Sequence, residues 1–277
     1  LTEDDFSKLY HCVDCGECPT EDQRILLQKE FLDTGYAFEG PEEMIQCFEQ
    51  HRTPYPTSEM RIRPPEGIPD ESDTLFFMGC LSTIRIPRYT EHSLQYLLKQ
   101  GVDFTILEEE VCCGWPWYVS GSTREIDICK EENLEVFKDY ETIICLCPAC
   151  YYLYKNYYQP ELGDVDIHYI TDYLEPAEEE KSGTVGFQHL CQLKNRGEEG
   201  TDKQVVEILR ESGYEVIDVP HWCCGGGIGY MHRTDIIDAV ARKRMEDFDI
   251  DGLDYVTTYC VSCWWILRRF SKQCRIK

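Results

Sequence analysis

Short apolar runs alternate along the chain with longer stretches in which apolar residues recur at helical spacing. Thr74–Gly79 is an apolar run typical of a buried strand, and Glu91–Gly101 is an amphipathic stretch closed by a glycine. The pattern predicts further strands at Val102–Leu107, Thr142–Leu146, Val185–His189, Glu215–Val219 and Tyr255–Thr258, and further helices at Thr123–Tyr140, Asp202–Gly213 and Thr234–Phe248. Strands that alternate with helices predict an α/β fold with parallel sheets.

Two segments precede this alternation. We interpret residues 1–53 as a small cysteine-containing extension that is ferredoxin-like or docks a partner. The proline-rich stretch Pro54–Pro69 indicates a linker, which we place at residues 54–73. The rest of the chain is predicted to form two tandem Rossmann-like repeats, at residues 74–182 and 183–277.

The cysteines that follow the predicted strands form two copies of one pattern. A shift of 111 positions places Cys80, Cys112 and Cys113 on three later cysteines, and a shift of 113 positions does the same for Cys147 and Cys150. The second copy consists of Cys191, Cys223, Cys224, Cys260 and Cys263. Such self-similarity indicates one supersecondary unit used twice. Because ligands of parallel α/β sheets bind beyond the carboxyl ends of the strands, the five thiols of each copy are expected to meet there.

Composition narrows the classes of function. The 277 residues include 17 cysteines, an odd number, and the chain is long enough to bury its own core. These features favour thiolate metal sites over a disulfide framework, and a reducing, cytoplasmic location. The chain opens with polar, acidic residues, and no apolar run approaches membrane-spanning length. The net charge of −25 argues against a nucleic-acid partner, because phosphate binding needs clustered Lys and Arg.

Five clustered thiolates favour a particular kind of metal site. A structural zinc ion takes four ligands in a tetrahedral array, and a regular iron–sulfur cubane usually takes four cysteines. A fifth sulfur and a vicinal pair are better accommodated by an opened iron–sulfur cluster with bridging thiolates. Gly114 and Gly225–Gly227 follow the vicinal pairs, where glycine either lets the backbone pass close to a bulky ligand or forms an ordinary turn.

The repeated Cys-Cys-Gly at Cys112–Gly114 and Cys223–Gly225 resembles the cysteine-rich CCG domain, over residues from about Thr74 to Cys263. The pattern is similar to that of the B-type catalytic subunit of methanogen heterodisulfide reductase and of the carboxyl-terminal region of its D-type relative. The resemblance implies two noncubane four-iron four-sulfur clusters. One cluster would be held by Cys80, Cys112, Cys113, Cys147 and Cys150, and the other by Cys191, Cys223, Cys224, Cys260 and Cys263.

The resemblance also implies a reaction, the reductive cleavage of the coenzyme M–coenzyme B mixed disulfide to two thiols. Two clusters that face one cavity would each capture one sulfur and supply one electron. The substrate is anionic, so nearby cations are expected to bind it, and the candidates are Arg85, Arg88, Lys194 and Arg196. Two histidines beside the second cysteine copy, His189 and His221, are candidates to protonate a departing thiolate. Ordinary structural roles remain the alternative for each of these residues.

A third cysteine group, Cys12, Cys15 and Cys18–Pro19, resembles a ferredoxin element but lacks the three-residue gap before the final Cys-Pro. Cys47 is a candidate fourth ligand for a four-iron cluster or another metal. The remaining cysteines, Cys129, Cys145 and Cys274, have no counterpart in the repeat and are interpreted as buried spectator thiols.

Three classes of function remain open from the sequence. The first is the catalytic subunit of a heterodisulfide reductase-type complex in methanogenesis. Its electrons would come from a ferredoxin-like C-type subunit and a flavin-containing A-type subunit or an equivalent donor, because no nucleotide fingerprint follows a predicted strand. The second is an electron-relay subunit of a thiol:fumarate, lactate/glycolate or quinone-linked oxidoreductase. The third is a zinc-binding scaffold without redox activity.

Overall fold

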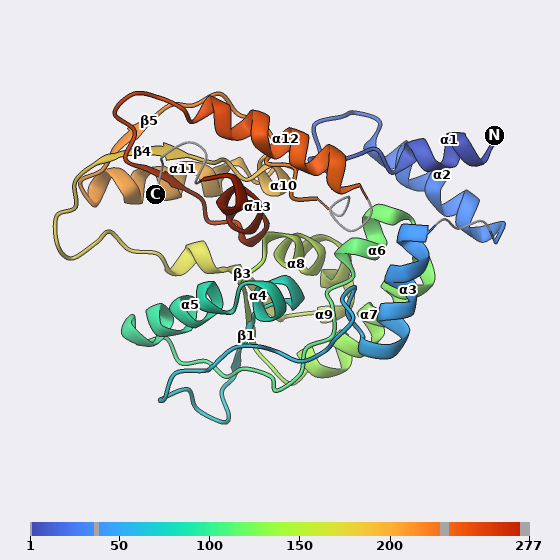
Figure 1. Cartoon of the computed structure of the whole chain (residues 1–277). Coiled ribbons are helices and arrows are strands. Elements are labelled where there is room, and N and C mark those ends of the chain that lie inside the picture. The colour runs from blue at the N-terminus through green and yellow to red at the C-terminus, as the bar shows by residue number, and fades with distance from the viewer. Residues whose placement is uncertain (1, 36–38, 228–232, 272–277) are drawn as a thin grey trace. The chain divides into compact units, whose positions relative to one another are not determined.

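The computed structural model describes residues 2–35, 39–227 and 233–271 (Figure 1). Cys274 lies outside the described residues. The chain folds into two compact units: unit 1 comprises Leu1–Leu9 and Asp22–Tyr173, and unit 2 comprises Tyr10–Glu21 and Leu174–Lys277. The predicted extension of residues 1–53 is thus divided between the two units, with its first three cysteines in unit 2 and Cys47 in unit 1.

Unit 1 is built on a three-stranded parallel sheet in the order β1-β2-β3, formed by Thr74–Phe77, Thr142–Cys145 and Asp166–Tyr169. Its α-helices are α1 (Glu3–Leu9), α2 (Glu21–Asp33), α3 (Glu39–His51), α4 (Cys80–Arg85), α5 (Pro87–Lys99), α6 (Trp115–Ser120), α7 (Thr123–Phe137), α8 (Pro148–Leu153) and α9 (Gln159–Leu162). A π-helical turn, η1 (Tyr154–Tyr158), and a 3₁₀ turn, η2 (Ile170–Tyr173), complete the unit.

Aromatic rings pack on the apolar sheet of unit 1. Phe77 of β1 meets Phe137 of α7 and Tyr154 of η1 edge to face, with ring centroids 5.7 and 5.2 Å apart. All three residues are fully buried. Such ring contacts add to the free energy gained from burial, so β1 and β2, which carry the cysteine loops, rest on a rigid support.

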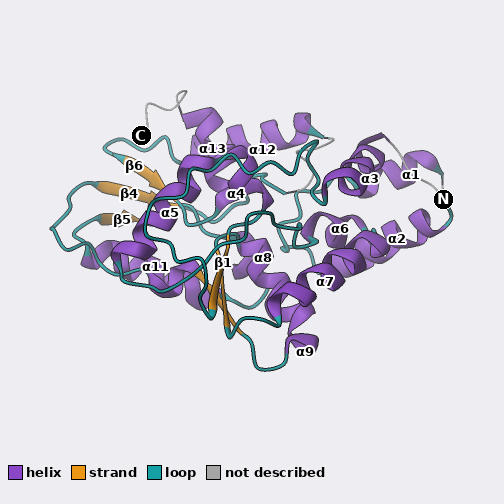
Figure 2. Ribbon diagram, turned by 90° about the horizontal axis from the view of Figure 1, so that it is seen from below, coloured by secondary structure: helices purple, strands orange, loops and turns teal. Residues whose placement is uncertain are grey.

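Unit 2 repeats this plan with the sheet order β5-β4-β6, again all parallel (Figure 2). The strands are β4 (Thr184–Phe187), β5 (Glu215–Ile217) and β6 (Tyr255–Thr257), and the helices are α10 (Cys191–Lys194), α11 (Glu199–Glu211), α12 (Thr234–Asp247) and α13 (Val261–Ser271). Gly186 lies in the central strand because a Cβ there would come within 2.8 Å of the ring of Phe248. The glycine therefore lets the end of α12 pack directly on β4.

The predicted α/β class and the parallel sheets are confirmed, and so are most elements within a few residues. The predicted strand Val102–Leu107 is wrong as a strand, because only Thr105 pairs with β1, through hydrogen bonds to Phe76 and Thr74 of 2.9 Å each. The prediction omitted β3, the N-terminal helices and the short helices that begin at the cysteine loops.

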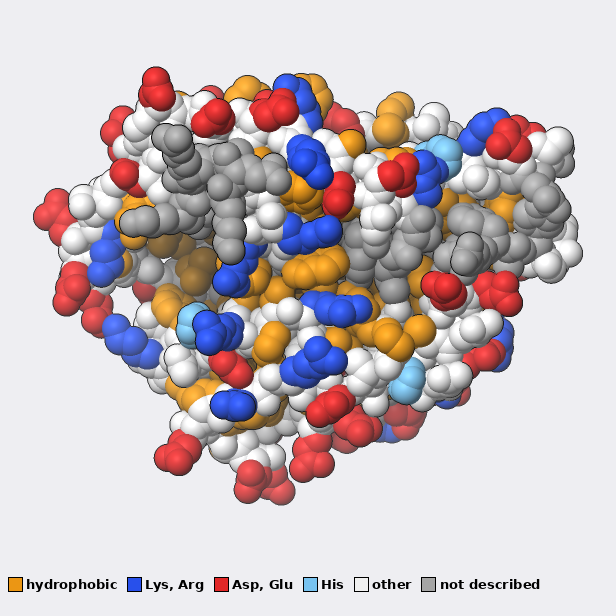
Figure 3. Space-filling view, in the orientation of Figure 1, with side chains coloured by type: hydrophobic (Ala, Val, Ile, Leu, Met, Phe, Trp, Pro, Cys, Tyr) orange, Lys and Arg blue, Asp and Glu red, His pale blue; other side chains and the backbone are white. Residues whose placement is uncertain are grey.

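In the view of Figure 3, acidic side chains lie mainly around the edge of the face, and several Lys and Arg side chains lie nearer its middle. The net charge of −25 argues against a binding site for polyanions. Within the described part of the chain, every helix is too short or too polar to cross a lipid bilayer.

Candidate functional site

In unit 1, the five repeat cysteines converge at the carboxyl ends of β1 and β2. Cys80 begins α4 directly after β1, Cys147 precedes α8 directly after β2, and Cys150 lies in the first turn of α8. The Cys80 and Cys112 sulfurs are 3.9 Å apart. The contacts continue from Cys112 to Cys113, from Cys113 to Cys150 and from Cys150 to Cys147. The five sulfurs of this copy thus form a continuous series of neighbouring contacts.

The backbone passes close to the sulfurs of these thiols. Gly79, between β1 and Cys80, has a φ of 85°, and a Cβ there would lie 3.3 Å from the Cys150 sulfur. Any side chain at this position would be strained and would crowd the sulfurs. Pro148 occupies the first turn of α8, where its fixed φ favours helix initiation immediately after Cys147.

A buried carboxyl group holds the loop before Cys80 through hydrogen bonds. Glu110 accepts hydrogen bonds from the backbone N–H groups of Met78 and Gly79, both at 2.7 Å. Burial raises the pKa of Glu110 from 4.5 to about 7, and the two backbone hydrogen bonds oppose this rise. The sequence pattern did not single out Glu110, although it lies only two residues before the vicinal cysteines.

In unit 2, the second copy has the same order of sulfur contacts. The Cys191 and Cys223 sulfurs are 3.8 Å apart, Cys224 contacts Cys223 and Cys263, and Cys263 contacts Cys260. Backbone N–H groups point at the sulfurs: Gly225 N donates to Cys223 Sγ over 3.2 Å, and Gly226 N donates to Cys224 Sγ over 3.3 Å. These donors stabilise negative charge on sulfur.

One thiol in each copy is the most acidic. Hydrogen bonds from the Cys223 and Cys263 thiols hold the pKa of Cys224 well below its ordinary value. Burial raises the pKa of Cys113, but hydrogen bonds from Cys112 and Cys150 outweigh it and bring that pKa below the ordinary range. The lowered pKa lets the second cysteine of each vicinal pair offer a thiolate to a metal.

The loop before Cys191 is held by a different acid from the one in unit 1. Asp202 of α11 accepts from Leu190 N over 3.3 Å, lies 2.7 Å from His189 Nδ1 and accepts from the Tyr259 hydroxyl. Burial raises the pKa of Asp202, yet the hydrogen bonds from His189 and Tyr259 lower it overall. Asp202 is thus a buried carboxylate that orients the His189 imidazole.

His189 also opens onto a groove of about 600 Å³ within unit 2, between α11 and the strands β4 and β5. The groove carries both signs of charge on an apolar floor. Its lining includes Phe187, His189, Lys194, Asp202, Lys203, Val206, Glu207, Arg210, Val216, Ile217 and Asp218. The ring of His221 lies 5.5 Å from that of His189, and burial together with the charge of Lys194 lowers the pKa of His221 to about 4.

The predicted cations have different surroundings. Lys194 lines the groove beside His189. Arg196 does not fit the predicted role of substrate contact, because its side chain is 8% exposed and its Nη2 lies 2.7 Å from Glu21 Oε1. Arg85 is exposed, with its guanidinium 4.9 Å from the Tyr55 ring centroid, and Arg88 is exposed near the start of α5.

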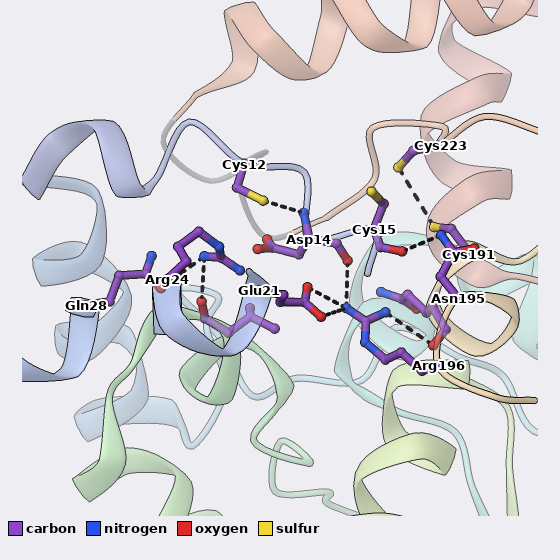
Figure 4. A network of polar contacts seen from close by, with 12 residues as sticks. Cys12, Asp14, Cys15, Glu21, Arg24, Gln28, Cys191, Asn195, Arg196 and Cys223 are labelled. Atoms are coloured by element: carbon purple, nitrogen blue, oxygen red, sulfur yellow. Dashed lines mark hydrogen bonds and ion pairs between the residues drawn. The ribbon is translucent and has the colours of Figure 1, made fainter. Parts of the chain in front are cut away.

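Two further cysteines contact the repeat thiols. Cys129 of α7 hydrogen-bonds to Cys112, so it is a neighbour of the first site rather than the spectator that we predicted. Cys15 belongs to unit 2 and hydrogen-bonds to Cys223, which lowers the pKa of Cys15 to about 6 (Figure 4). Cys145 is fully buried in β2, as predicted. None of the sixteen described cysteines forms a disulfide bond.

The donor sets fit an iron–sulfur group in their chemistry. Each offers five adjoining soft sulfurs, glycines at the points of closest approach and, in unit 2, backbone donors to sulfur. Among the described side chains, no three His, Cys, Asp or Glu residues are already spaced to hold one metal ion. The cavity between the unit 2 thiols has a volume of about 10 Å³, that of one water, so a cluster would require the sulfurs to move apart.

Relatives of the chain carry iron–sulfur or reductase names. It is 26% identical over 297 residues to an uncharacterized iron–sulfur protein of Methanocaldococcus jannaschii, covering 98% of this chain and 60% of that protein. It is 26% identical over 195 residues to the B-type component of fumarate reductase (CoM/CoB) from Methanothermobacter marburgensis, covering 68% and 40%. It is 23% identical over 290 residues to the D-type component of the dihydromethanophenazine:CoB–CoM heterodisulfide reductase of Methanosarcina acetivorans, covering 92% and 71%. The chain thus spans about 60% of the length of the first of these relatives.

The fold has a counterpart of known structure. A hypothetical protein from Helicobacter pylori matches with a TM-score of 0.59 at 13% identity, over 92% of this chain and 53% of that one. In sequence, residues 74–154 and 185–268 each match the family model of the cysteine-rich domain CCG. Because these two matches cover more than half of the chain, it belongs to the family of proteins with the cysteine-rich CCG domain, which it contains twice.

Proposed function

We propose that this protein is the iron–sulfur catalytic subunit of a heterodisulfide reductase-type complex and cleaves a small anionic disulfide to two thiols. The observation that carries the proposal is the duplicated site, in which five thiols follow one another in the same order in both units. The relationship to the D-type component of a heterodisulfide reductase supports the same class of reaction.

In this proposal, each repeat holds one noncubane four-iron four-sulfur cluster through its five cysteines. Such clusters, when bound, supply single electrons and soft iron atoms with affinity for sulfur. The chain's own contribution is to hold the backbone loops that carry the thiols. Glu110 holds the loop before Cys80, and Asp202 holds the loop before Cys191. Both loops are therefore set before any cluster binds, which lowers the entropy lost on binding.

The groove of unit 2 supplies the groups that a substrate of this kind needs. Lys194, Lys203 and Arg210 would bind the sulfonate, phosphate or carboxylates of the coenzyme M–coenzyme B disulfide. His189 has Nδ1 engaged by Asp202, which leaves Nε2 to deliver a proton to a departing thiolate. His221, whose pKa is about 4, is neutral at pH 7, so it adds no positive charge for the anionic substrate and holds no extra proton to donate.

A second candidate is supported by a difference between the two units. The shift of 111 positions that relates the repeats takes His189 to Met78 and Lys194 to Thr83, and both of these residues are buried in unit 1. The first site thus lacks the histidine and the lysine of the second. This favours an electron-relay role for the first site, which is the role that the sequence left open for a subunit of a thiol:fumarate, lactate/glycolate or quinone-linked oxidoreductase.

The experiment that tests the proposal begins with iron, acid-labile sulfide and zinc per chain in anaerobically purified protein. We expect about eight irons and eight sulfides. The protein is then incubated with the coenzyme M–coenzyme B disulfide and with reduced viologen as electron donor, and the amount of thiol released is measured. Thiol release that His189→Gln lowers while iron content stays constant supports the disulfide reductase. Reducible clusters without thiol release support the relay role, and zinc without sulfide rejects both.

The proposal also implies partners. Because no nucleotide fingerprint follows a predicted strand, we propose that its electrons come from a ferredoxin-like protein and a flavin-containing protein of the same complex, in the reducing cytoplasm. Two of the relatives named above are themselves single components of reductases, which supports a place in a larger assembly.

A further inference from the structure

The N-terminal segment Tyr10–Glu21 is anchored within unit 2 by the residues that follow Cys191. Arg196 Nη2 lies 2.7 and 2.8 Å from the two carboxylate oxygens of Glu21 and donates to the Asp14 carbonyl over 3.3 Å. Asn195 Nδ2 donates to the Cys15 carbonyl over 2.8 Å. Asn195 and Arg196 directly follow α10, the helix that begins at Cys191, so the element that presents one site cysteine also positions the segment around Cys15.

The segment forms part of the wall of the second cysteine site. Val13 and Asp14 line the same small cavity as Cys191, Cys223 and Cys263. Gly227, three residues after Cys224, lies so close to the segment that a Cβ would come within 2.1 Å of the Val13 carbonyl oxygen. The glycine after the second Cys-Cys-Gly therefore makes room for the N-terminal segment.

Within this wall, the Cys15 side chain points at the site. Its sulfur lies beside that of Cys223 (Figure 4). The two thiols hydrogen-bond to each other. Gln192 lines the same cavity, and its side-chain oxygen is buried without a hydrogen-bond partner among the described atoms. A buried polar group of this kind indicates that something other than protein completes the cavity.

In each unit a sixth thiol lies beside the five repeat cysteines. The two units take this thiol from different elements. In unit 1, Cys129 contacts Cys112, and a Cβ at Gly114 would lie 3.4 Å from the Cys129 Cβ. In unit 2, the residue in that position is Val240, whose Cβ would lie 3.2 Å from a Cβ at Gly225. The second site thus lacks the helix cysteine, and Cys15 of the N-terminal segment brings a sulfur to the first member of its vicinal pair instead.

We propose that Cys15 is a sixth sulfur ligand of the iron–sulfur group in unit 2, beside Cys191, Cys223, Cys224, Cys260 and Cys263. This rests on the proposed function only in that it requires a cluster in unit 2. The proposal assigns Cys15 to the unit 2 site and not to the separate N-terminal metal site that its ferredoxin-like spacing suggested. We do not extend this role to Cys12 and Cys18, because it is the Cys15 thiol that hydrogen-bonds to Cys223, and Cys18 is exposed.

The test uses anaerobically purified, cluster-loaded protein and alkylation with iodoacetamide, followed by peptide mass mapping. We expect Cys15 to be protected together with Cys223, and Cys18 to be labelled. After the iron is removed with a chelator, Cys15 is expected to be labelled as well. The Mössbauer and EPR spectra of Cys15→Ser are expected to lose or shift the signals of one cluster, whereas those of the matched control Cys12→Ser match the unmodified protein.

Three results would overturn the inference. Rapid labelling of Cys15 in the loaded protein, or Cys15→Ser spectra that match the unmodified protein, would show that it is not a ligand. About four additional irons per chain that Cys12→Ser, Cys15→Ser and Cys18→Ser each abolish would instead establish a separate N-terminal cluster. A chain that binds no iron and sulfide at all fails the proposed function itself, which makes that failure distinct from the other three.

Discussion

Replacing Glu110 with glutamine should remove one specific pH dependence of stability. In the folded protein the pKa of Glu110 is raised to about 7 from an ordinary 4.5 by burial. The folded state therefore binds a proton at Glu110 more tightly than the unfolded state does. Below pH 4.5, Glu110 is protonated in both states and its ionisation does not lower the free energy of unfolding. As the pH rises from 4.5 to 7, stability is lost, because the buried carboxyl must ionise. The difference corresponds to about 3 kcal/mol at about 1.4 kcal/mol per pH unit.

The substitution also weakens the clasp on the loop before Cys80. The carboxylate accepts from both Met78 N and Gly79 N, whereas a glutamine side chain has one oxygen to offer. Leaving one buried N–H without an acceptor costs about 1–3 kcal/mol. At pH 8 the two effects of the substitution nearly cancel, while at pH 5 only the loss remains. We therefore expect Glu110→Gln to be destabilised at pH 5 and close to the unmodified protein at pH 8.

The assay is the thermal midpoint of cluster-loaded protein under anaerobic conditions, read from circular dichroism at pH 5, 6, 7 and 8. For a chain of this size, about 3 kcal/mol corresponds to a change of roughly 6–12 °C between the two ends of this range. The matched control is Glu109→Gln, which changes an exposed neighbour and should leave the pH profile unaltered. A Glu110→Gln profile parallel to that of the unmodified protein would refute the assignment of a protonated buried carboxyl at neutral pH.

Three further predictions concern iron binding, proton delivery and stability. Gly79→Ala, which strains a positive φ and crowds Cys150, should lower the iron content to about half, measured by metal analysis, and full iron content would contradict this. Asp202→Asn should reduce thiol release about tenfold or more, by loosening His189, at unchanged iron content; unchanged release would show that His189 needs no orienting carboxylate. Arg244→Met should lower stability in denaturant unfolding by about 1–3 kcal/mol for each buried acceptor that loses its donor. The buried guanidinium donates to Gln188 Oε1 and Pro220 O, both at 2.6 Å, and an unchanged midpoint would mean that these contacts contribute nothing.

The repeated pattern made the fold class and the convergence of ten thiols predictable. Both follow from local rules, since apolar runs form strands and parallel strands present their carboxyl ends at one edge of a sheet. The predicted strand Val102–Leu107 shows where such rules end. Its residues are apolar enough, yet only Thr105 pairs with β1. Whether a run forms a strand depends on which backbone partners the tertiary fold supplies.

The residues that hold the cysteine loops could not be found by spacing. Glu110 and Asp202 perform the same task from different places, one in a loop and the other on α11. Arg196 was predicted to meet a substrate because it is a cation near Cys191, but Glu21, 175 residues away in the chain, neutralises it. A sequence shows the residue types that are available, whereas their pairing depends on distances that only folding creates.

For this protein, then, the amino-acid sequence alone specified the duplication, the parallel α/β repeats and the ten cysteines at the strand ends. These features depend on periodicity and on residue type, which are properties of the chain itself. The tertiary structure decided that Cys129 and Cys15 join the two sites from unrelated elements, and that His189 is held by Asp202 beside the groove. Such contacts join residues far apart in sequence. They arise because packing brings side chains together in three dimensions, and no spacing along the chain encodes them.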